Sequence, residues 1–114
     1  MKKRSGIKHA TYANSAFRFY ARHEHGAVKL PSVGKGLSDA VCLDWMLCHE
    51  IMAALPSHDR NVLCAVYRSS GPLPDVVIRV ADEYGVHAGC VWNLITRATK
   101  DFISKKEAHY NAAN

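Results

Sequence analysis

The chain has 114 residues, of which 48% are hydrophobic and 22% are charged. This length holds one modest hydrophobic core and is too short for two, and the composition is typical of a folding chain rather than a disordered one. Lys and Arg number 15 against 10 Asp and Glu, which gives a formal net charge of +5. No run approaches the ~18 apolar residues that a membrane-spanning helix needs, so a membrane-spanning protein is excluded.

The positive charge is concentrated in the first third of the chain. Residues 1–37 carry eight Lys and Arg against Glu24 alone, whereas basic and acidic residues balance from Pro74 onward. A basic leader suits contact with a polyanion, because Lys and Arg near phosphates release condensed counterions. A solvated, mobile leader is the alternative. The leader residues with a candidate binding role are Lys2, Lys3, Arg4, Lys8, Arg18 and Arg22.

The N-terminal sequence predicts the cellular compartment, and the compartment predicts the redox state of the cysteines. The basic start of the chain is not followed by the apolar stretch of a signal peptide, so we expect a cytoplasmic protein. In that reducing compartment the cysteines are expected to be free thiols, packed as small hydrophobic residues. They are Cys42, Cys48, Cys64 and Cys90.

The first predicted elements are two helices separated by a loop. Apolar spacing indicates a short helix over 12–22, and the glycines and proline of 26–36 indicate a loop. Ser38 is typical of an N-cap, and the helix after it is expected to continue to Leu55. The segment Val41–Leu55 is too apolar for a single narrow stripe, which predicts either a central core helix or self-association through this helix.

Three further helices are predicted after Pro56. Ser57 is expected to cap the first, Pro74 to lie in the first turn of the second, and the last to run from Ala88 to Lys106. We therefore expect an all-α fold: a small helical bundle with a C-terminal helix-turn-helix and a basic, partly irregular N-terminal leader. The predicted divisions are a leader at 1–37, a helical domain at 38–107 with the helix-turn-helix at 74–104, and a frayed tail at 108–114.

The stretch from Val77 to Arg97 has the spacing of a helix-turn-helix. Two helices that cross at a wide angle need a small residue where they approach, and Ala81 meets that need. The turn between them needs a positive φ, which Gly85 adopts without steric cost. The residues expected on the inner surfaces are Val80, Tyr84, Val86, Val91 and Leu94, extended by Ile95, Ala98 and Phe102.

The other face of the second helix has the residue types of a DNA recognition helix. Asn pairs with adenine, Thr and Ala meet a thymine methyl, and Arg or Lys reaches guanine or phosphate. Gly89 costs helix stability, which suggests a close approach to a phosphate. A plain helical hairpin within a bundle is the alternative, and Trp92 suits a protein partner as well as DNA. The predicted DNA-binding residues are His87, Ala88, Gly89, Trp92, Asn93, Thr96, Arg97 and Lys100.

The sequence contains no set of residues with the types and spacing of a catalytic or metal-binding site. We therefore expect that the protein is not an enzyme and binds no cofactor and no metal. Cys48 and His49 are adjacent on a helix and point about 100° apart, which does not suit a nucleophile and its base. His58 and Asp59 are typical of a solvated helix start. The cysteine spacing contains no Cys-x-x-Cys, and His23 with His25 is an isolated pair.

These residues resemble region four of the sigma-seventy factors over about half of the chain. The resemblance departs at the connection 69–74, which is longer, and at His87, which replaces the usual Ser or Thr cap. The opening Ser38-Asp39-Ala40 ahead of Leu55-Pro56 is similar to the small phage late-gene antiterminators of the Q type, or related late-gene activators. The residues that carry the first resemblance are Leu55, Pro56, Arg60, Val62, Leu63, Tyr67, Val80, Ala81, Gly85, Val86, Val91, Arg97 and Ala98.

The resemblance implies double-stranded DNA and RNA polymerase as partners. A Q-type antiterminator would bind beside a phage late promoter and modify paused polymerase so that it reads through terminators. The basic leader and the apolar helix around Trp45 would then contact polymerase, RNA or a second copy of the chain. An operator-binding repressor or activator without antitermination, and a protein-only interaction module, remain open as alternatives.

Overall fold

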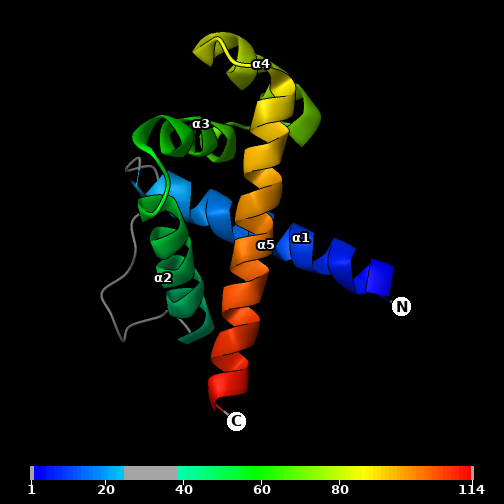
Figure 1. Cartoon of the computed structure of the whole chain (residues 1–114), viewed down its shortest axis with the longest axis vertical. Helices are drawn as coiled ribbons and strands as arrows, with labels where there is room; N and C mark the ends of the chain where they lie inside the picture. The colour runs from blue at the N-terminus through cyan, green and yellow to red at the C-terminus, as the bar shows by residue number, and fades with distance from the viewer. Residues whose placement is uncertain (1, 25–38, 114) are drawn as a thin grey trace.

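The computed structural model describes residues 2–24 and 39–113, and every regular element within them is an α-helix (Figure 1). The expected all-α fold is confirmed for this part of the chain, whereas the loop predicted at 26–36 lies outside the described residues. None of the described helices is long and apolar enough to cross a membrane. The helices of the described ranges are α1 (Lys2–Glu24), α2 (Asp39–Ala53), α3 (Ser57–Arg68), α4 (Leu73–Tyr84) and α5 (Ala88–Ala113).

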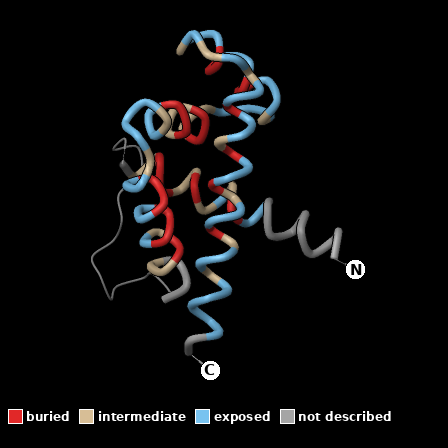
Figure 2. Tube along the Cα trace, in the orientation of Figure 1, coloured by how far each residue is buried: buried red, intermediate tan, exposed pale blue. Residues whose placement is uncertain are grey.

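The longest helix, α5, runs along the long dimension of the molecule. In Figure 1, α1 crosses α5, α2 and α3 lie to one side of it, and α4 lies at its N-terminal end. α1 packs against α2, α3 and α5, and α4 packs against α3 and α5. Figure 2 shows that the buried positions lie where the helices meet. Each helix contributes to one shared core, and its fully buried large side chains include Phe17, Met52, Leu63, Tyr67, Val76, Val77 and Phe102.

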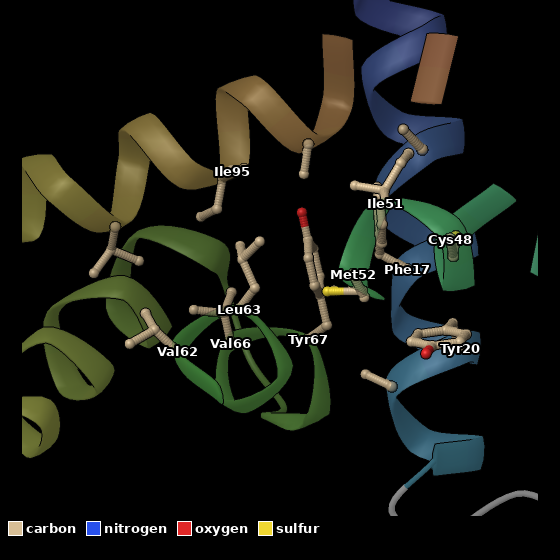
Figure 3. Packing of buried hydrophobic residues seen from close by; sticks show 14 of the residues in the cluster. Phe17, Tyr20, Cys48, Ile51, Met52, Val62, Leu63, Val66, Tyr67 and Ile95 are labelled. Carbon is tan, nitrogen blue, oxygen red and sulfur yellow. The ribbon is translucent and has the colours of Figure 1, made fainter. Parts of the chain in front are cut away.

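α1 differs from the expected leader. A short helix was predicted over 12–22 within a partly irregular segment, but Lys2–Glu24 is a continuous helix of 23 residues. Its buried face belongs to the same core as the other helices, and the Phe17 ring stacks on Tyr67 at 5.1 Å and lies 5.7 Å from Phe102 (centroid distances). Figure 3 shows Phe17 and Tyr67 in one cluster with Met52. The irregular part of the leader was therefore a wrong prediction for residues 2–11, which continue the helix that was expected over 12–22.

The connection between α2 and α3 is shifted slightly from its predicted place. α2 ends at Ala53, two residues before the predicted Leu55, in a turn where the Leu55 amide donates to the Met52 carbonyl. Ser57 begins α3 and does not cap it, since Pro56 takes the N-cap position and accepts from the Arg60 amide. α2 packs against α1 and α5, and its residues Leu47, Cys48, Ile51 and Met52 are buried within one copy of the chain, whereas Met46 is 59% exposed.

α5 is longer at its C-terminus than the sequence predicted. The helix was expected to end at Lys106 and to be followed by a frayed tail at 108–114, but α5 continues to Ala113. No Gly or Pro interrupts the sequence after Phe102, and Ala, Lys and Glu in this segment favour helix. α5 is therefore helical beyond its predicted end, as far as Ala113.

A polar cluster joins α1, α2 and α5 beside the core. Asp44 is buried, accepts a hydrogen bond from the Tyr12 hydroxyl, and pairs with Lys106 at 3.0 Å between Nζ and Oδ1. The Lys106 ammonium also lies 3.8 Å from the centre of the Tyr12 ring. The bond to Asp44 raises the pKa of the Tyr12 hydroxyl. Asp44 thus has two partners, so its charge is compensated, and the cluster fixes α1 and α2 against the C-terminal half of α5.

Replacing Phe17 tests whether α1 is part of the folded core. Phe17→Ala should lower the free energy of unfolding by about 3–5 kcal/mol, because it leaves a cavity between Tyr67 and Phe102. Urea denaturation monitored by circular dichroism measures the loss. Phe19→Ala is the matched control, since Phe19 is only half-buried on the same helix, and its loss should be much smaller. Equal small losses for both variants would show that α1 folds apart from the core.

Candidate nucleic-acid interface

α4 and α5 are joined by a short turn that begins at Gly85. Gly85 has φ 66° and ψ 31°, the left-handed conformation that the sequence predicted for it. The turn is closed by two amides, with Gly85 donating to the Asp82 carbonyl at 3.2 Å and Val86 to the Ala81 carbonyl at 2.9 Å. Because these bonds occupy two carbonyls of the last turn of α4, the chain leaves the helix in a fixed direction.

The inner surfaces of the two helices match most of the predicted pattern. Val80, Ala81 and Val91 are buried as expected. Tyr84, Val86 and Leu94, also expected inside, are only partly buried at the edge of the core. Sequence reasoning missed Val76 and Val77, which are fully buried. They precede Val80 by four and three residues, a spacing that places all three on one apolar face of a helix. The rest of the α5 stripe is buried as predicted at Ile95, Ala98 and Phe102.

The predicted recognition face lies on the outside of α5. Asn93 and Arg97 are exposed, and Trp92 is 38% exposed despite its large apolar ring. Ala88 is half-buried at the first turn. In Figure 2 exposed and buried segments alternate along α5, as expected for a helix covered on one side only. The exposed members of the predicted set are His87, Gly89, Trp92, Asn93, Thr96, Arg97 and Lys100.

His87 caps the N-terminus of α5, a role that the sequence analysis did not assign. Its Nδ1 atom accepts a hydrogen bond from the Gly89 amide at 3.1 Å, and its carbonyl accepts from the Cys90 amide at 2.9 Å. The imidazole thus does what a Ser or Thr hydroxyl does at this position in other helices, provided that Nδ1 carries no proton. Imidazole is an uncommon cap, so residue type alone gave little signal.

Gly89 has a structural explanation in this cap. A Cβ atom built at Gly89 would lie 3.3 Å from His87 Nδ1, a tight contact with the capping ring. The helix therefore accommodates the imidazole by having no side chain there. This explains the glycine without a phosphate, whereas the sequence analysis had interpreted Gly89 as a sign of close approach to one.

The basic residues of the predicted leader lie on α1. Lys2, Lys3, Arg4 and Lys8 are in its first turns, but their side chains lie outside the described part of the structure. Two other leader residues are described, and both are half-buried: Arg18 and Arg22.

The side chain of Arg18 reaches the connection between α3 and α4. One of its Nη atoms donates to the Gly71 carbonyl at 3.4 Å. Arg79 of α4, which the sequence analysis did not single out, donates to the neighbouring Ser70 carbonyl at 3.1 Å. This connection therefore carries positive charge from two helices, and the contact with Arg18 spans 53 residues of sequence.

The Cys48 and His49 pair does not form a nucleophile and its base. Cys48 is buried, and burial raises the pKa of its thiol, which disfavours the reactive thiolate. The His49 ring stacks on Trp45 at 5.3 Å, and its Nδ1 atom shares a hydrogen bond with the Tyr20 hydroxyl at 3.0 Å. Cys90 is exposed, contrary to the expectation that every cysteine packs inside. Within 2–24 and 39–113 no group of three or more His, Cys, Asp or Glu residues could hold a metal ion.

Variants at positions 87 and 89 test the cap on α5. His87→Ala should lower the free energy of unfolding by about 1 kcal/mol, because the Gly89 amide loses its acceptor, and His87→Ser should restore most of it. Gly89→Ala should stabilise the His87→Ser protein by about 1 kcal/mol through helix propensity, and the wild type by less, since the new methyl group crowds the ring. Thermal denaturation of the wild type, Gly89→Ala, His87→Ser and the double variant His87→Ser, Gly89→Ala measures this coupling. An equal gain in both backgrounds would contradict the ring contact.

No family model, curated protein or solved structure matches this chain. The resemblance to region four of the sigma-seventy factors therefore rests on the residues quoted for it.

Proposed function

We propose that the protein is a non-enzymatic, DNA-binding regulator of transcription that uses α4 and α5 as a helix-turn-helix. The observation that supports this most directly is the outward face of α5, where Asn93, Thr96 and Arg97 are exposed on a helix whose opposite face is buried. These side chains carry the donors, acceptors and methyl group that read base edges in a major groove. A helix of this width fits that groove when its exposed side faces the bases.

The geometry before α5 supports the same function. The left-handed Gly85 and the His87 cap fix where α5 begins, and α4 packs against its N-terminal part. A recognition helix contacts bases with its N-terminal residues, and the first helix of the motif crosses the backbone. The exposed residues from His87 to Lys100 occupy that N-terminal part of α5.

Antitermination is the finer proposal, and the resemblance to Q-type late-gene antiterminators supports it. Such a protein binds DNA near a late promoter and then acts on RNA polymerase, so it needs a protein-binding surface in addition to a DNA-binding face. Trp92 at 38% and Ile78 at 63% exposure are large apolar side chains on the α4–α5 unit that suit a protein contact. The same exposures favour a protein-only interaction module as the second candidate.

Substitution of Asn93 and Arg97 tests DNA recognition by α5. A binding sequence is first selected from a random pool of duplexes, and affinity is then measured by fluorescence anisotropy. Asn93→Ala and Arg97→Ala should each weaken binding to the selected duplex by about 1–3 kcal/mol and reduce discrimination against unrelated duplexes. Lys105→Ala, an exposed change further along α5, is the control and should retain discrimination. A pool that yields no consensus, or unchanged discrimination, would contradict the recognition helix.

A transcription assay separates antitermination from repression. The template carries the selected sequence beside a promoter, with a terminator downstream. Read-through of the terminator in the presence of the protein is the result expected of an antiterminator, and Asn93→Ala should reduce it. Loss of initiation without read-through would assign the protein as a repressor instead.

A further inference from the structure

The connection between α3 and α4 brings two arginine side chains to adjacent carbonyl groups. Arg79 donates to the Ser70 carbonyl at 3.1 Å and Arg18 to the Gly71 carbonyl at 3.4 Å, and both contacts are exposed to solvent. Gly71 has φ 110°, a conformation that residues with a Cβ rarely adopt. The glycine thus allows a backbone turn on which guanidinium groups from α1 and α4 converge.

The two arginines bring positive charge from α1 and α4 to this turn. The two acceptors belong to adjacent residues, so this turn receives one guanidinium group from α1 and one from α4. The ion pair found among the described side chains joins Lys106 to Asp44 and involves neither arginine. Asp75, Asp82 and Glu83 lie one turn from Arg79 on α4 and lower the local positive charge, although none of them forms an ion pair with it.

The two guanidinium groups retain free donors for an anion. Each arginine has five N–H donors in a planar fork, of which one makes the contact described above. A phosphate group offers several acceptor oxygens and a negative charge, and it binds arginine more strongly than a neutral carbonyl does. An anion that contacts both guanidinium groups would also bridge α1 and α4.

We infer that Arg18 and Arg79 form a site for a backbone phosphate of DNA, next to the groove that α5 enters. This inference rests on the proposed function, because the first helix of a helix-turn-helix crosses the DNA backbone and Arg79 lies on that helix. It assigns α1 a direct role in binding through a side chain fixed by the fold.

Charge-removing substitutions that retain a hydrogen-bond donor test the site. Arg18→Gln and Arg79→Gln keep an amide for the carbonyl of the turn but remove the positive charge. Each should weaken binding to the selected and to an unrelated duplex alike, by about tenfold at 0.1 M salt. The slope of log affinity against log salt should become shallower by about one for each variant.

Arg60→Gln is the matched control. Arg60 is exposed in the first turn of α3, at the opposite end of that helix from the turn at Gly71, and its variant has the same net charge as the two test variants. It should leave the salt slope unchanged. If Arg18→Gln and Arg79→Gln behave as Arg60→Gln does, the two arginines only hold the turn and the inference is overturned.

A second measurement separates failure of this site from failure of the proposed function. Inorganic phosphate is titrated into the free protein, and the Gly71 amide signal is followed by nuclear magnetic resonance. A saturable shift that is lost in the Arg18→Gln, Arg79→Gln double variant supports a phosphate site even if the wild type binds no DNA. If phosphate causes no saturable shift and the salt slope is unchanged in both variants, the inferred phosphate site is overturned. This holds even where the variants at Asn93 and Arg97 confirm recognition by α5.

Discussion

The packing of Phe17 between Tyr67 and Phe102 is the contact on which the arrangement of the helices depends. It joins α1, α3 and α5 at the centre of the molecule, where all three rings are excluded from solvent. Close packing in such a cluster leaves little freedom for a helix to shift. Because Phe102 belongs to the middle of α5, this cluster holds α5 by its buried face while the exposed face of its N-terminal part stays accessible.

The Asp44 cluster reinforces this attachment from the polar side. Lys106 lies one turn after Phe102, so the same segment of α5 meets an aromatic cluster and a compensated charge. Removing one member of a buried ion pair is costly because its partner is left unpaired. α5 is therefore held at two places, by Phe102 and Lys106 in its second half and by the His87 cap at its N-terminus. These attachments orient the segment between them and leave its outer face free of contacts with the other helices.

The features of the fold that could be predicted from the sequence are those encoded by local chemistry. Gly85 adopts the left-handed conformation because a β-carbon is costly there, and the exposed face of α5 follows from a helical period that any packed helix must satisfy. The attachment of α1 to the core was not predicted, because it depends on contacts with Tyr67 and Phe102, which lie far away in the sequence.

The features that escaped prediction depend on pairs of residues rather than on single ones. The capping bond of His87 was missed because it combines an uncommon capping residue with a glycine two positions later, where a Cβ atom would lie 3.3 Å from the ring. The contact between Arg18 and the Gly71 carbonyl spans 53 residues, so no local pattern records it. The exposed face of α5 could thus be predicted from the helical period, apart from the half-buried Ala88, whereas the contacts of Arg18 and Arg79 with the turn could not.

The integration of α1 into the core changes what its basic residues can contribute to binding. Charges on a mobile leader attract a polyanion but do not define its position, because the leader has many conformations to lose. Arg18 lies on a helix that packs directly against α3 and α5, so its distance from the exposed face of α5 is set by the fold. Backbone contacts fix the register of a protein on DNA, and base contacts then discriminate sequences. A rigid link between the two kinds of contact would make the recognition face of α5 effective with few base-contacting residues.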